Sequence, residues 1–326
     1  MKKKLTMLAA IAGVSALALS GCGAGTTDDA SGDKTYNIAI GQLVSHPSLD
    51  ASVTGFKAAI EDAGLKVTYD EQNAQGDQGT ANSIAQKFAT AKPDLVLAVA
   101  TPMAQAVAQN IADVPVLFTA VTDPEAAELV DSNEKPGANV TGTTDLNPVA
   151  EQIDLVKQAK PEAKKVGVIY SSAEVNSEVQ VKLARDEAKK EGLELVEKAI
   201  TNSSEVMQAV KSLDDVDAIY VPTDNTVVSA LDSVLQVAEE NKILVVVGEA
   251  TSVENGGALT YGLDYEQLGR QTGEMAVRIL TEGEVTATMA VEAQKTPQLV
   301  VNPTAAERMG ITLPQELLDK ADKIIK

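Results

Sequence analysis

Residues 94–102 are Asp94-Leu-Val-Leu-Ala-Val-Ala-Thr-Pro102, an unbroken apolar run that ends in a hydroxyl and a proline. An apolar run of this length, closed by turn residues, is typical of a strand buried on both faces of a parallel sheet. An amphipathic stretch follows at 103–111, and a second apolar run occupies 115–120. Strand, helix and strand in this order form a βαβ unit, so we predict an α/β fold built on parallel sheets.

The same alternation fills the chain from residue 36 and starts again after a linking segment near 137–148. The first half has predicted strands at 36–44, 66–71, 94–100 and 115–120, and predicted helices at 50–63, 78–91 and 103–111. The second half has predicted strands at 164–170, 193–200, 217–221, 243–247, 258–263 and 298–301, and predicted helices at 149–160, 174–191, 204–213, 226–241, 265–282 and 314–325. Small polar clusters follow the strands of both halves. We therefore predict two Rossmann-like lobes whose strand ends face one cleft, where open parallel sheets bind ligands.

The first 22 residues have the form of an export signal. Three lysines precede an apolar run at 5–19 that is too short to span a bilayer as a mature helix. The run ends in Leu19-Ser-Gly-Cys22, which resembles the lipobox of bacterial lipoproteins, in which the peptide is cut before a cysteine that takes a diacylglycerol. Cys22 is the only cysteine, so it forms no internal disulfide. We predict a signal peptide at 1–21, lipidation of Cys22, a flexible tether at 22–35 and an extracytoplasmic location, with a soluble secreted protein as the alternative.

Composition narrows the class of protein further. About 305 residues remain after the signal, enough for two domains. The chain is 44% hydrophobic but only 3% aromatic and has no tryptophan, so we expect cores of valine, isoleucine, leucine and alanine. The net charge of −20 becomes −23 without the signal, which carries three lysines and no acid. A field of that sign repels phosphate backbones, which excludes nucleic acid as a partner.

Sequence signals for catalysis are missing. There is one histidine, His46, so the usual histidine and cysteine metal cluster is not available. No Gly-x-Ser-x-Gly, no Gly-x-Gly-x-x-Gly after the first strand and no Walker-type loop occurs. We expect no catalytic residue, metal or cofactor. A surface hydrolase built around His46 is the competing hypothesis.

The candidate ligand-binding residues lie where predicted strands end or the next helices begin. They are His46, Thr101, Thr122, Asn176, Asp224, Asn225, Glu249 and Asp264. Free N–H groups at a helix start would bind a carboxylate, and a ligand ammonium group needs an ionised acid nearby. Helix capping is the alternative for several of them, with Thr101 at 103–111, and Ser48 or Asp50 at the first helix. Sequence leaves open which acid would meet an ammonium group.

Several motifs together resemble a family of ABC-transporter substrate-binding proteins over residues 36–326, the family of tryptophan, tyrosine and phenylalanine binders. The motifs are QLVSHPSLD (42–50), NAQGD (73–77), ATP (100–102), FTAVTDP (118–124), NVTGT (139–143), VPTDN (221–225), TYGLDY (260–265) and LVVN (299–302). The resemblance implies a type I periplasmic-binding-protein fold, with lobes joined by three crossing strands near 142–147, 260–265 and 288–298. It assigns 36–143 and 265–288 to the N-terminal lobe, and 144–264 and 289–326 to the C-terminal lobe.

The resemblance also implies a function. Thr101, Ala120 and Thr122 would hold the α-carboxylate of an amino acid, and an acid of the second lobe would hold its ammonium group. Tyr170 and Tyr261 are the best-placed rings for stacking an aromatic side chain. The chain would be a monomeric, lipid-anchored component of an ABC importer that passes its ligand to a permease and its ATPase. A ligand-sensing surface lipoprotein, or a binder of another small polar solute, is the alternative.

Overall fold

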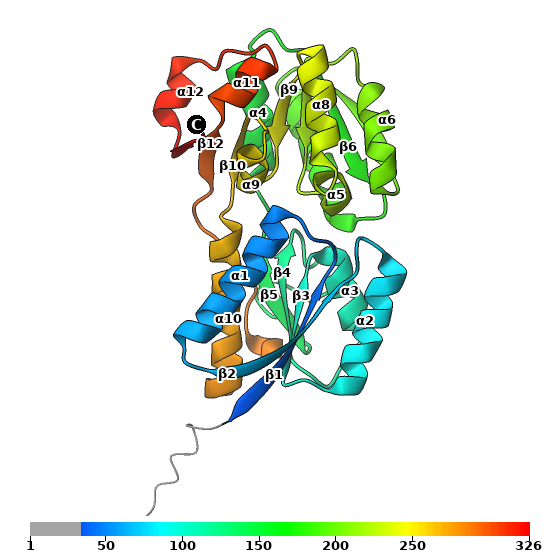
Figure 1. Cartoon of the computed structure of the whole chain (residues 1–326), viewed down its shortest axis with the longest axis vertical. Coiled ribbons are helices and arrows are strands. Elements are labelled where there is room, and N and C mark those ends of the chain that lie inside the picture. Colours follow the sequence, from blue (N-terminus) through cyan, green and yellow to red (C-terminus); the bar gives the residue numbers. More distant parts are fainter. Residues whose placement is uncertain (1–33) are drawn as a thin grey trace, which may run out of the picture. The chain divides into compact units, whose positions relative to one another are not determined.

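The computed structural model describes residues 34–326; the predicted signal peptide, Cys22 and nearly all of the predicted tether lie outside the described residues. Residues Thr35–Lys326 form one compact unit. It contains two sheets, each with helices on its faces (Figure 1). The predicted α/β class with two parallel-sheet lobes is confirmed. Among the helices of the described part, none is long and apolar enough to cross a membrane.

The first sheet has six strands in the order β11-β5-β4-β3-β1-β2, all paired in parallel. Its strands are β1 (Thr35–Gln42), β2 (Lys66–Asn73), β3 (Leu95–Val99), β4 (Val116–Val121), β5 (Val140–Thr144) and β11 (Glu292–Ala293). Its helices are α1 (Pro47–Asp62), α2 (Gln78–Ala91), α3 (Thr101–Asn110) and α10 (Tyr265–Val277), followed by the short π-helix η2 (Arg278–Glu282) and the 3-10 helix η3 (Thr286–Thr288).

The second sheet has seven strands in the order β13-β12-β10-β9-β8-β6-β7, and only the β10–β12 pair is antiparallel. Its strands are β6 (Lys165–Ser171), β7 (Glu194–Ile200), β8 (Ala218–Val221), β9 (Leu244–Val247), β10 (Leu259–Gly262), β12 (Gln298–Val301) and β13 (Lys323–Ile324). Its helices are α4 (Val149–Ala159), α5 (Val175–Lys190), η1 (Ser203–Glu205), α6 (Val206–Lys211), α7 (Asn225–Val228), α8 (Leu231–Asn241), α9 (Ala250–Glu254), α11 (Pro303–Arg308) and α12 (Gln315–Lys320).

The chain passes between the sheets three times, at 145–148, 263–264 and 294–297. The last passage is shorter than the predicted one at 288–298, because β11 still pairs with β5. Strand β5 falls inside the segment predicted as a linker. The sequence of β5 lacks an apolar run. The strand can still be buried, because its threonine hydroxyls find hydrogen-bond partners inside the lobe. Thr141 Oγ1 donates to the Met289 carbonyl at 2.7 Å, and Thr143 Oγ1 donates to Thr119 Oγ1 at 3.2 Å.

One predicted helix is divided. The stretch predicted as a helix over 226–241 forms α7 and α8, with Ala230 between them at φ −121° and ψ 26°. Ser229 Oγ donates to the Thr226 carbonyl at 2.8 Å, which offers that carbonyl an alternative to a helical partner. The break places the short helix α7 directly behind the polar end of β8.

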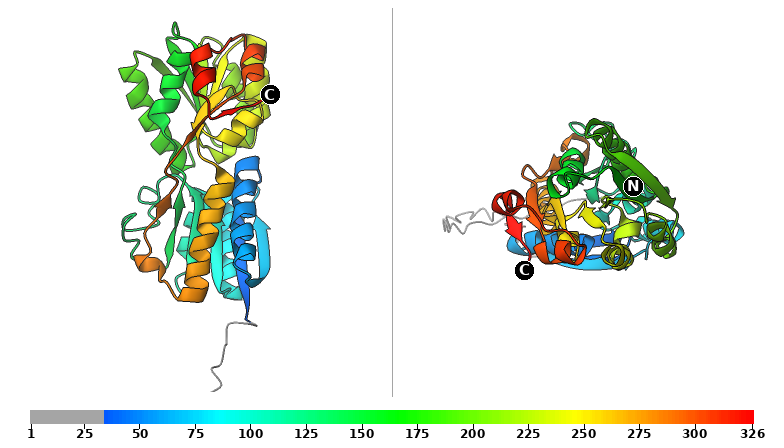
Figure 2. Two further views of the ribbon diagram at one scale, coloured as in Figure 1. Left: turned by 90° about the vertical axis from the view of Figure 1, so that its left-hand side faces the viewer. Right: turned by 90° about the horizontal axis from the view of Figure 1, so that it is seen from above.

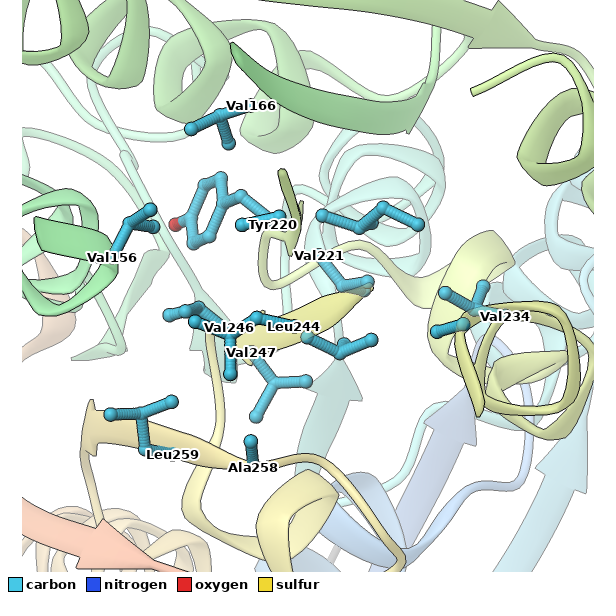
Figure 3. Packing of buried hydrophobic residues seen from close by; sticks show 14 of the residues in the cluster. Val156, Val166, Tyr220, Val221, Val234, Leu244, Val246, Val247, Ala258 and Leu259 are labelled. Carbon is cyan, nitrogen blue, oxygen red and sulfur yellow. The ribbon is translucent and has the colours of Figure 1, made fainter. Parts of the chain in front are cut away.

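The core of the second lobe is aliphatic, as the composition predicts. Figure 3 shows its strands contributing valine and leucine side chains around Tyr220, with Val156 and Val166 beside the ring. The Tyr220 hydroxyl donates to Gln152 Oε1 at 2.7 Å, so the polar tip of the ring is satisfied. Each such apolar side chain contributes about 1.5–3 kcal/mol when fully buried.

Helices α1 and α10 lie side by side in the first lobe (Figures 1 and 2) although about 200 residues separate them in sequence. Glycines permit their close approach. A Cβ on Gly269 would lie 1.9 Å from the Ser52 carbonyl oxygen, and one on Gly55 would lie 1.9 Å from the Glu266 carbonyl oxygen. These contacts fix α10, which follows the second crossing, to the first lobe.

Replacing Gly269 by alanine should therefore force the two helices apart. We expect Gly269→Ala to lower the free energy of unfolding by about 1–3 kcal/mol, the usual cost of overpacking, measured by urea denaturation. Gly79→Ala in α2 is the matched control, because its Cβ would meet only Asp77 Oδ1 at 3.3 Å. The control should be neutral or more stable by up to about 1 kcal/mol. Equal stability of the two variants would contradict the close packing of α1 and α10.

Candidate functional site

Polar side chains gather at the carboxyl ends of both sheets. In the first lobe His46 follows β1, Thr101 opens α3 directly after β3, and Thr122 follows β4. In the second lobe Asn176 begins α5 after β6, Asp224 and Asn225 follow β8, and Glu249 follows β9. With Ala120 in β4, all of these predicted residues are at most 8% exposed. Burial of so many polar groups at strand ends is what a ligand site in an open α/β sheet requires.

The two sets of strand ends face each other. Ser48 at the start of α1 donates to Glu249 Oε2 at 2.5 Å and also contacts Thr251 Oγ1, both in the second lobe. At the other side Gln78 Nε2 donates to the Ala173 carbonyl at 3.1 Å. A cavity of about 510 Å³ lies between the lobes, lined by residues of both, among them Leu43, Pro102, Ser171, Glu174 and Asn225. Its volume suits a small-molecule ligand.

Four side chains at the facing strand ends have buried polar atoms without a hydrogen-bond partner, and one of them, Ser171, lines the cavity. They are both ring nitrogens of His46, Thr101 Oγ1, Ser171 Oγ and Asn176 Oδ1. Asn176 uses its Nδ2 to donate to Glu174 Oε2 and to the Thr223 carbonyl, both at 3.2 Å, which leaves its oxygen as the free acceptor. An unpaired buried polar group costs about 1–3 kcal/mol. Together these atoms form a set of donors and acceptors that a bound ligand would satisfy.

The backbone is strained at the same place. Ala100 has φ 79° and Ala120 has φ 55°, values that non-glycine residues rarely adopt. The register between β4 and β5 shifts between Phe118 and Val121, so Ala120 lies in a bulge. Strain of this kind, and bulges that redirect the chain, concentrate at functional sites. The backbone at the ends of β3 and β4 thus departs from regular strand geometry, as is common beside ligand sites.

Two helix caps differ from the prediction. Ala100, not Thr101, is the N-cap of α3, and Thr101 is the first helical residue, so its hydroxyl is not used as a cap. His46, not Ser48 or Asp50, is the N-cap of α1, and no side chain caps that helix. The reason is the same in both cases. Prolines at 47 and 102 occupy the first turn and start each helix earlier than the apolar pattern suggests.

Four carboxylates are buried at the strand ends and the first crossing: Asp145, Glu174, Asp224 and Glu249. Of these, Glu174 lines the 510 Å³ cavity. Within residues 34–326 no lysine or arginine side chain is buried, so none of them has a cationic partner beside it in the interior. Burial raises the pKa of Asp145 to about 6, and that of Asp224 and of Glu249 to about 7. The negative charge of nearby Glu174 raises the pKa of Asp224 further. These buried acids therefore lack a positive charge nearby, and a cation bound beside them would be favourable.

The four acids differ in how many donors they already have. Asp224 accepts from Ser171 N at 2.6 Å, Ser177 Oγ at 2.7 Å and Val227 N at 2.8 Å, all in its own lobe. Glu174 accepts five hydrogen bonds, from Asn176, Asn225 and Thr226. Asp145 accepts only one bond on each oxygen, from Thr122 Oγ1 at 3.0 Å and from the Tyr265 hydroxyl at 2.7 Å. Glu249 accepts on Oε2 from Ser48 Oγ and, at 3.4 Å, from Ser252 Oγ. Asp145 and Glu249 thus accept the fewest hydrogen bonds of the four acids, two each.

Asp264 lies apart from this cluster. Its side chain is exposed and its Oδ1 caps α10, accepting from Glu266 N at 3.0 Å and Gln267 N at 3.1 Å. The two tyrosines predicted to stack a ligand pack against the second-lobe core, and neither lines the interlobe cavity. Tyr170 lies near Arg185 of α5, and Tyr261 lies near Lys320 of α12.

Sequence reasoning missed Asp145, Glu174 and Tyr265. Asp145 and Tyr265 lie at two of the passages between the lobes, and their hydrogen bond joins those passages. Glu174 is the N-cap residue of α5, but its carboxylate binds across to the start of α7. In an acid-rich sequence, little distinguishes these acids from surface ones. One signal was available for Asp145, which directly follows the Thr-Gly-Thr-Thr segment.

Paired lobes, facing strand ends and unmet buried polar groups define a solute-binding protein of the periplasmic-binding-protein class. The chain belongs to the family of ABC transporter substrate-binding proteins, which it matches over residues 37–325. Members of this family bind solutes and are not enzymes, so the hydrolase hypothesis is wrong. Among residues 34–326 no group of three or more histidine, cysteine or acidic side chains could hold a metal ion.

Three relatives illustrate the family. The "Tyrosine-binding protein" of Clostridioides difficile (strain R20291) is 45% identical over 314 residues, covering 92% of this chain and 90% of the relative. The ABC domain in complex with L-Trp from Streptococcus pneumonia is 36% identical, with a TM-score of 0.86, covering 90% of this chain and 100% of the other. The ligand-free, open structure of a substrate-binding protein with adhesive properties from Clostridium difficile is 44% identical, with a TM-score of 0.67, covering 89% and 99%.

The arrangement of the lobes is closer to the ligand-bound relative. The chain superposes better on the L-Trp complex than on the open structure, although the open structure is nearer in sequence. The Ser48–Glu249 bond joins the lobes in this arrangement. The geometry described above therefore resembles that of the L-Trp complex more than that of the open structure.

The raised pKa of Glu249 makes a prediction about stability. Its pKa is about 7 in the folded chain and 4.5 in the unfolded chain. As pH rises from about 4.5 to 7 the unfolded chain loses this proton first, so the free energy of unfolding falls by up to about 1.4 kcal/mol per pH unit. Glu249→Gln should gain stability relative to wild type over that range and then stay level above pH 7.

The measurement is the pH dependence of urea unfolding for wild type and Glu249→Gln. Glu134→Gln, on an exposed loop, is the control and should follow wild type at every pH. Titration of His46 and Asp224 is common to all three proteins and cancels in the difference. The pKa of Asp145 should fall in Glu249→Gln, because the charge of Glu249 contributes to its rise, and this change adds to the gain in stability of the variant. A Glu249→Gln difference that is constant with pH would contradict a buried, proton-binding carboxyl at this position.

Proposed function

We propose that this chain is the solute-binding component of an ABC importer and that it captures an amino acid, with tyrosine and tryptophan favoured, by closing its lobes. The observation that carries the proposal is the combination of unmet buried polar atoms with buried acids that lack a cation. A zwitterion supplies both missing parts, because it brings one cation and one anion at fixed spacing.

The carboxylate would lie in the first lobe. The N-terminus of α3 presents backbone N–H groups that have no acceptor within the helix, with Thr101 Oγ1 beside them. Thr122 and the strained backbone at Ala120 end the neighbouring strand. These groups favour an anion without placing a formal positive charge in the cleft.

The ammonium group would lie near Asp145 and Asn176 Oδ1. Asp145 has unused acceptor capacity, and Asn176 Oδ1 has no partner. Among the acids predicted from sequence, Asp224 is saturated by its own lobe, Glu249 accepts from Ser48, and Asp264 is exposed. Asp145 is chosen over Glu249 because it is hydrogen-bonded to Thr122, beside the groups assigned to the carboxylate, whereas Glu249 is bonded to Ser48 of α1.

The side chain of the ligand would enter the 510 Å³ cavity, which Leu43, Val44 and Pro102 line on the first-lobe side. Relatives named for tyrosine and solved with L-Trp support an aromatic amino acid. Ligand touches both lobes only in the closed form, so binding shifts the equilibrium from open to closed. A permease would then distinguish the closed surface from the open one.

A ligand screen tests the proposal directly. Thermal unfolding with each of the twenty amino acids should show stabilisation by an aromatic one, of about 2.7 kcal/mol at a hundred times its dissociation constant. Absence of any response would overturn the amino-acid assignment and favour another small polar solute.

The ammonium assignment has its own test. We expect Asp145→Asn to weaken binding of the amino acid identified in the screen at least about 100-fold in isothermal titration, since removing one partner of a buried ion pair costs about 3–5 kcal/mol. The ligand-free variant should be no less stable than wild type, because an unpaired buried charge is removed. Asp264→Asn is the control and should leave affinity unchanged. The opposite ranking of the two variants would return the role to Asp264.

We further propose that lipid on Cys22 holds the protein at the outer face of the cell membrane, as a monomer near its permease and ATPase. The sequence Leu19-Ser-Gly-Cys22 and the family's role outside the cytoplasm support this. Cys22→Ser should move the protein from the membrane fraction to the medium or periplasm, as followed by immunoblot. A variant that stays with the membrane would contradict a lipid anchor at this residue, while a Ser20→Ala control should fractionate as wild type.

A further inference from the structure

His46 has a side chain that the fold does not use. It is the N-cap of α1, but the cap is made by its backbone, whose carbonyl accepts from Asp50 N at 3.0 Å. The side chain is only 5% exposed, and neither ring nitrogen has a hydrogen-bond partner of normal geometry. A buried imidazole that leaves both nitrogens unmet is costly unless something else pairs with it.

The ring is neutral at physiological pH. Burial lowers the pKa of His46 to about 4, although the side chain of Asn225 and the charges of Asp50, Glu174 and Asp145 oppose the shift. These groups come from α1, from the start of α5, from α7 and from the first crossing segment, and none of them is a cation. A neutral imidazole has one N–H donor and one lone-pair acceptor. The partner it lacks is therefore a group that can donate, accept, or do both.

The position of His46 separates it from the groups assigned to the amino-acid backbone. In the sheet order β5-β4-β3-β1 it lies two strands from the end of β4, about 10 Å at the usual strand spacing. Thr101, after β3, lies between. Across the cleft it faces Asn225, which lines the 510 Å³ cavity, and its own ring lines an adjoining cavity of about 220 Å³ that shares Ser229. His46 therefore lies on the side of the cleft that a ligand side chain would occupy.

We infer that His46 hydrogen-bonds a hydroxyl or ring N–H on the ligand side chain, so that the site selects tyrosine or tryptophan over phenylalanine. The inference rests on the proposed function and adds the basis of its specificity. Phenylalanine would fill the same space but leave both His46 nitrogens unpaired. A site built to pair with a polar group rejects the analogue that lacks it far more strongly than an apolar pocket rejects a difference in size.

The test compares affinities for L-tyrosine and L-phenylalanine by isothermal titration, in wild type, His46→Leu and His46→Gln. Wild type should prefer tyrosine by about 100-fold or more. His46→Leu should reduce that ratio to below about tenfold, chiefly by losing tyrosine affinity. His46→Gln keeps a donor and an acceptor and should recover part of the preference. Ser45→Ala, an exposed neighbour bonded to Asp50, is the matched control and should keep the wild-type ratio.

The outcomes are separable from those of the proposed function. If no aromatic amino acid binds wild type, the ligand class is wrong. If wild type binds tyrosine but His46→Leu weakens tyrosine and phenylalanine equally, His46 contacts the ligand backbone and the inference is overturned. A wild type that does not discriminate between the two ligands also overturns it. Should His46→Leu fail to fold by circular dichroism, the His46→Gln ratio and the wild-type preference still decide.

Discussion

The main constraint on this structure is that four carboxylates are buried with no cationic side chain beside them. Asp145, Glu174, Asp224 and Glu249 lie at the strand ends and the first crossing, where every compensating group within residues 34–326 is a neutral donor: a hydroxyl, an amide or a backbone N–H. Neutral donors hold an acid in place but offset its desolvation only in part, so the pKa values of Asp145 and Glu249 rise. A cationic group beside these acids would lower their pKa values again, which is why we propose a ligand that carries an ammonium group.

The fold brings these acids together by turning the polar ends of two parallel sheets toward one another. Strand ends alone would leave their clusters in solvent. Facing lobes remove that solvent and leave atoms such as Thr101 Oγ1 and Asn176 Oδ1 buried without a partner, which is why we propose that the ligand pairs with them. The strained Ala100 and Ala120 fit the same scheme, because the packed sheet around them stabilises a backbone they would not adopt alone. Specificity and closure thus rest on the same groups.

The elements follow closely from the sequence where local pattern decides. Apolar runs locate β3, β4, β8 and β9 to within a residue or so, because a strand buried on both faces has no alternative place in a soluble chain. The apolar pattern did not predict strand β5, which only the family resemblance placed in part, near 142–147. Its threonine hydroxyls, which find partners at Met289 and Thr119, replace the apolar signal. The break between α7 and α8 likewise depends on a side chain, Ser229, that competes for a helical carbonyl.

By itself the sequence determined the α/β class, the two lobes and the family, because periodicity and motif spacing are local properties, and it placed the candidate site at the strand ends. It named His46, Thr101 and Asn176, whose atoms the structure leaves unpaired at the facing strand ends. Only the tertiary structure decided the roles of the acids. Asp264 caps its own helix and is exposed, whereas both partners of Asp145 and two of the three partners of Asp224 lie more than twenty residues away in sequence. Desolvation and hydrogen-bond saturation are properties of the folded cleft, and no local pattern encodes them.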